Sequence, residues 1–292
     1  MTRLRVLSVL AVSLLAASAH ADFLSYNFNS TPVGNIQGGA DGRAPGNGQW
    51  WLPDNAATAG DVRDGIGYGG TRGLAIGNRG NGNDGVIDNL HTAQLFDRAG
   101  ETGFGSPGFQ NFFSTYRFRT ASDSAVTGLA FKTESWGRDR TTWLSVYEDG
   151  GSLKANYSGV TTPDNTPNSD VFTDNIYSGT LTWGAWYRVE TSIQFIDGAD
   201  NDVVITSLFD DSNALLWTIS DKTWENYYRL DSEQLFNGNQ VTGVDAMQFQ
   251  ARGSPTGDVA YVDDIYYSTV PTPGALALFG IGGLAAARRR RN

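Results

Sequence analysis

Aromatic and charged side chains gather in one polar stretch near the middle of the sequence. Trp136 is followed by Arg138, Asp139 and Arg140, just ahead of a predicted strand. Sugar rings stack on indole faces through their apolar C–H groups, while polar side chains at the rim bond the hydroxyls. The stretch therefore predicts a carbohydrate-binding site, which Tyr68 could join from a glycine-rich loop. The alternative is that Trp136 belongs to the core, because aromatic side chains also dominate core packing.

The other tryptophans divide into loop and strand positions. Trp50 and Trp51 lie in a loop-rich region and could join the same surface. Trp143, Trp186 and Trp217 lie in predicted strands, where they have apolar neighbours. We therefore predict that these three belong to the core.

Residues for catalysis are few. His91 is the one histidine that remains once a leader containing His20 is removed, so a multi-histidine metal centre cannot be built. No nucleophile-elbow sequence accompanies it. Glycoside hydrolysis needs only two carboxylates on opposite sides of a sugar, but the glutamates are isolated from one another: Glu134, Glu148, Glu190 and Glu225. The sequence favours a non-catalytic protein, with a secreted glycan-degrading hydrolase or lyase as the alternative.

The loops at 81–84 and 197–202 could each supply part of the ligands of a structural calcium ion, which takes about six to eight oxygens. Asp197, Asp200 and Asp202 share one loop, although its spacing does not match an EF-hand. Asp263 and Asp264 are adjacent in the last predicted strand, where a period of two sends them to opposite faces. One of the two is therefore predicted to be buried and to need a partner. Solvated turn carboxylates are the alternative to a calcium site.

Charge and cysteine content exclude whole classes of function. The chain has 31 acidic and 21 basic residues, and six of the basic residues lie in the two terminal segments. The remaining body repels nucleic acid and anionic lipid, whose binding requires clustered cations. It would also repel a strongly anionic polysaccharide unless a divalent cation bridged the two. Because cysteine is absent, no disulfide can stabilise the fold.

The pattern of residues 1–21 predicts a secretory signal peptide. Arg3 and Arg5 precede an apolar run, and the small-residue site Ala19-His20-Ala21 follows it. Cleavage after Ala21 would make Asp22 the first residue of the exported protein, and signal peptidase the first processing partner.

The C-terminal segment, residues 270–292, joins a proline-containing hinge to an apolar run over residues 274–287 and a cluster of arginines. This order resembles the PEP-CTERM sorting signal of Gram-negative bacteria, although Thr272 stands where the family usually has Glu. The resemblance implies export across the inner membrane, processing by an exosortase, transient membrane contact and a cell-surface or extracellular location. The residues that carry it are Val270, Pro271, Pro273, Arg288 and Arg289. An uncleaved weak anchor is the alternative; either way, the arginines stay on the cytoplasmic side.

The body, residues 22–269, is predicted to be one all-β domain. The 36 glycines and 12% aromatic residues of the whole chain favour short strands joined by tight turns. Alternating apolar and polar residues predict strands at 24–28, 112–118, 129–133, 142–148, 186–195, 203–209, 215–219, 244–249 and 259–267. The Asp-Gly-Gly turn within 148–152 predicts a hairpin. Shorter strands are expected at 73–76 and 86–88.

The order of these elements resembles the concanavalin A-like lectin and glucanase family. The segments that carry the resemblance are 26–28, 69–74, 183–190 and 261–266. It implies an antiparallel two-sheet jelly-roll sandwich whose first and last strands lie close together, with a structural calcium ion beside those strands, where Asp263 lies. The two terminal segments are expected to add an N-terminal signal helix and a C-terminal apolar helix. Since this fold supports lectins, adhesion modules and glycan-degrading enzymes alike, it leaves the function open. We expect an exported protein that binds polysaccharide or serves as a structural component of extracellular polysaccharide.

Overall fold

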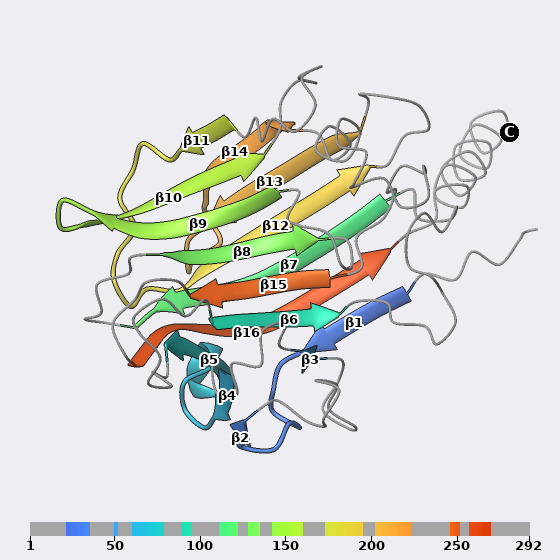
Figure 1. Cartoon of the computed structure of the whole chain (residues 1–292), viewed down its shortest axis with the longest axis vertical. Helices are drawn as coiled ribbons and strands as arrows, with labels where there is room; N and C mark the ends of the chain where they lie inside the picture. The colour runs from blue at the N-terminus through green and yellow to red at the C-terminus, as the bar shows by residue number, and fades with distance from the viewer. Residues whose placement is uncertain are drawn as a thin grey trace, which may run out of the picture.

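Two antiparallel β-sheets face each other across one hydrophobic core (Figure 1). The computed structural model describes residues 22–35, 50–51, 60–78, 89–94, 111–121, 128–134, 142–159, 173–194, 202–222, 246–251 and 257–269. The predicted all-β sandwich is therefore confirmed. The expected signal helix and C-terminal helix lie outside the described residues, as does the strand expected at 86–88.

The larger sheet has nine strands. Its order begins at one edge with β14 (Leu215–Lys222), β13 (Val203–Phe209), β12 (Tyr187–Gln194) and β7 (Asn111–Thr120). It continues with β16 (Gly257–Thr269), β5 (Gly73–Asn78), β4 (Gly60–Arg63) and β2 (Gly34–Asn35). The ninth strand, β1 (Asp22–Tyr26), also pairs with β16.

The smaller sheet has seven strands. From one edge they are β11 (Thr173–Ile176), β10 (Ser152–Gly159), β9 (Thr142–Asp149) and β8 (Leu129–Glu134). The order ends with β15 (Ala246–Ala251), β6 (Asn89–Gln94) and β3 (Trp50–Trp51). The chain crosses between the two sheets after β2, β3, β5, β6, β7, β11, β14 and β15, so segments far apart in sequence become neighbours.

The longest strand, β16, links the two ends of the domain. Its second half pairs with β1, where Tyr26 lies opposite Ile265, and its first half pairs with β5 along the same side. On its other side it pairs with β7. The first and last strands are thus adjacent, as predicted.

Alternation of residue type decides which side chains enter the core. On β7, Phe112, Ser114, Tyr116 and Phe118 are buried and the residues between them are half-buried, as their shared parity predicts. Rings from both sheets meet there; Phe118 lies 4.8 Å from Phe131 of β8, centroid to centroid. Hydrophobic burial of this kind is the main force that stabilises a sandwich without disulfides.

The predicted hairpin joins β9 to β10. Gly150 and Gly151 have φ values of 57° and 81°, the left-handed region that a two-residue hairpin turn requires at both positions. The sequence patterns missed β6, β11 and the short strands β2, β3 and β4. No helix among the described residues is long and apolar enough to cross a membrane.

Candidate functional site

Three arginines are neighbours on the outer face of the larger sheet. The register pairs Arg117 of β7 with Arg188 of β12 on one side and with Asp263 of β16 on the other. Two residues further along β7, Arg119 pairs with Tyr261 of β16. Side chains of alternating residues leave opposite faces of a strand, so these arginines point away from the core.

Aromatic rings lie against these arginines. The Arg117 guanidinium carbon is 3.9 Å from the centre of the Tyr68 ring. The Arg119 carbon is 4.7 Å from the Tyr261 ring and 5.2 Å from the Trp186 ring. Tyr68 meets Trp186 edge to face at 5.8 Å. We refer to Tyr68, Arg117, Arg119, Trp186, Arg188 and Tyr261 as the outer cluster.

A short loop carries Tyr68 onto the sheet. It contains the 3₁₀ turn η1 (Tyr68–Gly70), between β4 and β5. The buried Asp263 carboxylate fixes it, because Oδ2 accepts hydrogen bonds from the Tyr68 amide at 2.8 Å and the Thr71 hydroxyl at 3.1 Å. Arg119 adds a hydrogen bond of 3.1 Å to the Ile66 carbonyl. The position of Tyr68 therefore depends on a carboxylate at the far end of the sequence.

Gly67 allows this close approach. A Cβ atom at this position would be 2.2 Å from the Arg72 carbonyl oxygen and 2.6 Å from Asp263 Oδ2. Both distances are far below van der Waals contact. The loop can therefore bring its amides to the carboxylate only with glycine at residue 67.

A β-bulge changes the expected orientation of the two adjacent aspartates. Asp264 has φ of 49°, and the pairing of β16 with β7 shifts between Asp263 and Tyr266. A bulge inserts one extra residue, so the period of two fails across it. Asp263 binds the Tyr68 loop, while Asp264 Oδ2 lies 3.4 Å from Arg117 Nε, so both carboxylates are on the outer face. The prediction of opposite faces is wrong, whereas that of one buried, partnered aspartate is confirmed.

Burial has a clear electrostatic effect on Asp263. It raises the pKa of this carboxyl from 3.8 to about 6, and the hydrogen bonds from the Asp264 and Tyr68 amides offset the rise only in part. The carboxyl therefore titrates near the lower end of the physiological pH range.

The turn between β13 and β14 supports two of the arginines. Asn213 Oδ1 accepts hydrogen bonds from Arg188 Nε at 3.1 Å and from Arg117 Nη2 at 3.4 Å. Asn213 is placed by its left-handed backbone, with φ of 64°, and by its amide hydrogen bond to the Asp210 carbonyl. Glu190 pairs with Arg188 on the same strand.

These contacts leave the arginines incompletely satisfied. Among the described residues, the buried atoms Arg117 Nη1 and Arg119 Nε have no hydrogen-bond partner, and Arg119 has no carboxylate partner. Arg117 and Arg188 stand directly opposite across two strands, which destabilises a sheet. Burial lowers the pKa of Arg188, and the charge of Arg117 lowers it further. Like charges held together with unpaired buried donors cost stability, which makes this face the candidate functional site.

The sequence named one member of this cluster. Tyr68 lies in it, whereas Trp136, Arg138, Asp139 and Arg140 fall outside the described residues. The three arginines were missed because each is an isolated residue within a strand. Alternation along the strands could have revealed them. Arg117 and Arg119 alternate with core aromatics of β7, and Arg188 alternates with buried residues of β12, so all three belong to the outer face.

The prediction that three tryptophans belong to the core is wrong for two of them. Thr142 and Leu144 are the buried residues of β9, so Trp143 between them faces outward. Trp186 immediately precedes β12 and joins the outer cluster. Trp217 is half-buried and packs against the core. Trp143 alternates with its neighbours as a strand residue does, but the neighbours, not the tryptophan, occupy the buried positions.

The calcium prediction stays a prediction. Asp202 is buried, while Asp197, Asp200 and the loop at 81–84 lie outside the described residues. Asp263 accepts hydrogen bonds from two backbone amides and from the Thr71 hydroxyl, so its oxygens are used within the protein. Within the described ranges, no group of three or more metal-ligating side chains is present.

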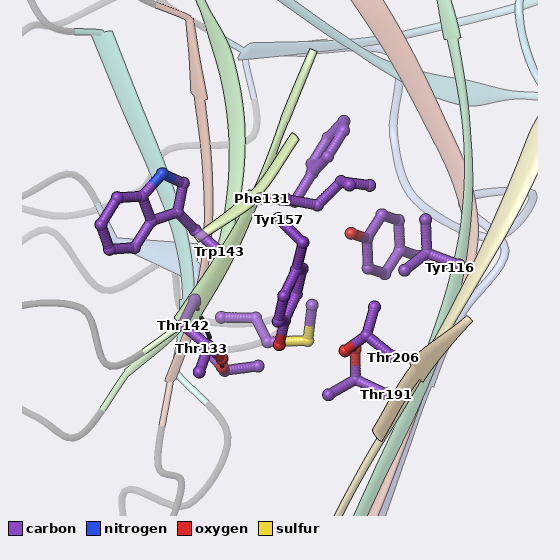
Figure 2. Close-up of a pocket in the computed structure, with 11 residues that line it drawn as sticks. Tyr116, Phe131, Thr133, Thr142, Trp143, Tyr157, Thr191 and Thr206 are labelled. Atoms are coloured by element: carbon purple, nitrogen blue, oxygen red, sulfur yellow. Dashed lines mark hydrogen bonds between the residues drawn. The ribbon is translucent and has the colours of Figure 1, made fainter. Parts of the chain in front are cut away.

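A second polar group of residues lies between the sheets (Figure 2). Hydroxyls pair at 2.8 Å between Thr133 and Thr142, and at 2.9 Å between Thr191 and Thr206. Tyr157 lies between these pairs, and burial raises its pKa to about 12. The free space is about 10 Å³, room for at most about one water molecule. This cavity belongs to the core and is too small for a sugar.

No protein-family model matches the sequence, and no curated protein shows significant similarity to it. Solved structures show a likeness of fold. An endo-β-1,4-glucuronan lyase from the fungus Trichoderma reesei is 13% identical over 82% of this chain and 95% of its own, with a TM-score of 0.45.

Two further structures are similar at the same level. The CBM2 module of the evolved Dit protein of Lactobacillus casei BL23 phage J-1 is 11% identical, covering 86% and 97% of the two chains, with a TM-score of 0.45. A PL-14 alginate lyase from Aplysia kurodai is 9% identical, covering 71% and 87%, with a TM-score of 0.44. These likenesses give no residue-level correspondence, so the site rests on this chain's own geometry.

Proposed function

We propose that this protein is exported and binds an acidic polysaccharide through the outer cluster. The observation that carries the proposal is the arrangement of three aromatic rings with three arginines on one face of the sheet. Rings supply flat apolar surfaces for sugars, and guanidinium groups supply forked donors for carboxylates. Together they match a chain of uronic acid units.

The local charge differs from that of the whole chain. The acidic body argues against an anionic ligand, yet three arginines gather at this face, where nearby carboxylates offset part of their charge. Within the described part of the chain, Arg117 Nη1 and Arg119 Nε are buried donors without a partner, so a carboxylate could reach them only if the side chains that cover them moved aside. A ligand group that reaches them removes the cost of leaving buried donors unpaired. Binding can therefore be favourable despite the net charge of −10.

Export and surface attachment are the second part of the proposal. They rest on the signal-peptide pattern of residues 1–21 and the sorting-signal pattern of residues 270–292. N-terminal sequencing of exported protein should begin at Asp22. Mass spectrometry of surface-released protein should show loss of the arginine-rich tail. A chain retained in the cytoplasm with both ends intact would contradict this part alone.

The binding proposal is tested by native gels cast with a polyuronate or with a neutral glucan. The protein should be retarded in the polyuronate gel. Trp186→Ala and Arg119→Gln should each bind the polyuronate about tenfold more weakly, as loss of one good contact predicts, and should migrate closer to the unretarded position. Trp143→Ala is the matched control, because this tryptophan lies on the outer face of the other sheet. Equal retardation of all four proteins would contradict the proposal.

The same gels separate binding from degradation. A cleared zone around the band would support the alternative, a glycan-degrading enzyme. Glu190 and Asp264 would then be the first residues to substitute, because both carboxylates border the outer cluster. Unhindered migration in every gel would instead favour a structural role without a specific glycan.

A further inference from the structure

A buried lysine joins the two sheets at one edge of the sandwich. Lys222 ends β14, the edge strand of the larger sheet, and its side chain is fully buried. Its Nζ donates to β11, the edge strand of the smaller sheet: to the Thr173 carbonyl at 2.9 Å, the Thr173 hydroxyl at 2.7 Å and Asn175 Oδ1 at 2.7 Å. Figure 1 shows these two edge strands beside each other.

The surrounding residues are shaped around this side chain. Gly159 of β10 lies against its stem, and a Cβ there would be 3.2 Å from both Cγ and Cδ of Lys222. Nearby, Tyr177 packs on Trp217 with ring centres 5.7 Å apart, which covers the same edge. The lysine is thus held in one position and shielded from solvent.

A carboxylate connects the lysine to the amide that it contacts. Asp221 Oδ2 accepts a hydrogen bond from Asn175 Nδ2 at 3.3 Å, and Asp221 Oδ1 lies 3.9 Å from Lys222 Nζ. One carboxylate therefore reaches both the amine and the amide nitrogen. The carbonyl carbon of Asn175 is one bond from the oxygen that Lys222 already contacts.

We propose that Lys222 and Asn175 form an intramolecular isopeptide bond, with Asp221 as the proton carrier. The Nζ–Cγ bond forms and the Cγ–Nδ2 bond breaks. Nζ starts as an ammonium group and ends as an amide N–H, so it gives up two protons through Asp221. Nδ2 takes both protons and leaves as ammonium, and Asp221 ends in its starting state. No oxidant, reductant or cofactor is needed.

Two physical effects favour this reaction at this place. Burial lowers the pKa of Lys222, which increases the fraction of neutral, nucleophilic amine, although the charges of Asp221 and Asp174 oppose the change. The fold also holds amine and amide in contact, which replaces an encounter in solution by an intramolecular step.

The bond would serve a chain that has no cysteine. It would close a loop between residues 47 positions apart and join the sheets covalently at an edge. A covalent link of this kind limits the unfolded state in the way a disulfide does. An exported protein would gain resistance to unfolding that is independent of redox conditions.

Peptide mapping of the full-length purified protein tests the bond. Trypsin should not cut after an acylated Lys222, so residues 155–188 should appear joined to residues 189–229, with a mass lower than the sum by one ammonia. Fragmentation should locate the link at Asn175 and Lys222. Complete cleavage after Lys222, with separate peptides 155–188 and 189–222 at their sequence masses, would overturn the proposal.

Three variants distinguish catalysis from accidental cross-linking. Asp221→Ala removes a half-exposed side chain and should leave a folded protein without the link. Asn175→Asp keeps a carbonyl carbon in place and should still link, with loss of water in place of ammonia. A link that persists at full yield in Asn175→Ala would show that another residue is joined and would also overturn the assignment.

Discussion

Two regions of this molecule hold buried cations, and they satisfy them to different extents. At the edge between β14 and β11, every hydrogen-bond donor of Lys222 has an acceptor at 2.9 Å or less. On the outer face, Arg117 and Arg119 each keep one buried nitrogen without a partner among the described residues. Arg117 also stands directly opposite Arg188.

The difference separates a structural site from a candidate binding site. A cation whose donors are all used holds the fold together and has nothing to offer a ligand. Donors left unused cost stability, and the fold retains them where a ligand can complete them. The four predictions that follow test this distinction.

Matched substitutions of the two cations should have the largest and most unequal effect. Lys222→Met removes three hydrogen bonds between the sheets, together with the proposed link to Asn175, and should lower the free energy of unfolding by about 3 kcal/mol or more. Arg117→Met also relieves its repulsion with Arg188 and should cost about 1 kcal/mol or less. Chemical denaturation measures both. Equal losses would remove the distinction between the two regions.

Gly67→Ala should come next, because it attacks the loop of the outer cluster. The added Cβ would collide with the Arg72 carbonyl and Asp263, so we expect a loss of about 2 kcal/mol. Polyuronate retardation should fall with it as Tyr68 moves. Gly65→Asn in the same loop is the control, since φ of 76° and open space suit asparagine. An unchanged melting temperature for Gly67→Ala would contradict the packing described for this loop.

The pH dependence of stability should report on Asp263. Its pKa is raised from 3.8 to about 6. Between these two pH values the folded state keeps a proton that the unfolded chain has released. The stability due to this group is complete below pH 3.8 and is lost as pH rises to about 6. Asp263→Asn has no carboxyl to titrate, so its free energy of unfolding should not show this decrease as the pH rises. Denaturant titrations from pH 4 to 7 give the difference between the two proteins, and parallel curves would show that Asp263 does not titrate there.

Glu190→Gln should have the smallest effect on stability. The variant loses a partly exposed ion pair with Arg188, which contributes about 1 kcal/mol or less. It also removes a negative charge beside the outer cluster, so polyuronate retardation should increase, most clearly at low salt. Glu148→Gln, at an exposed position on the other sheet, is the charge-matched control. Equal changes in both variants would indicate a general charge effect.

Much of the sandwich could be predicted from the sequence because strand parity is a local property. Phe112, Tyr116 and Phe118 point inward as their spacing indicates, and the strand predicted at 203–209 coincides with β13. The Asp-Gly-Gly hairpin was equally local. The alternation gives the wrong face where a strand contains an extra residue, as at Asp264. A bulge of this kind leaves no clear mark in the pattern of apolar and polar residues.

The candidate site was predicted only in part. Tyr68 was named from its loop, but its position depends on Asp263, 195 residues away. Trp186 was assigned to the core because apolar neighbours surround it in sequence, whereas Arg119 and Tyr68 surround it in space. Net charge indicated repulsion of anions, since a sum over the chain contains no information about where cations collect.

The sequence by itself determined the all-β class, the inward parity of the main strands, the absence of disulfides and the patterns at both termini. These follow from residue type and short spacing. Only the tertiary structure decided that Arg117, Arg188 and Asp263 form one row, and that Lys222 meets Asn175 across the edge of the sandwich. Strand order in a sandwich sets such neighbours, and strand order depends on long-range pairing that no local pattern encodes.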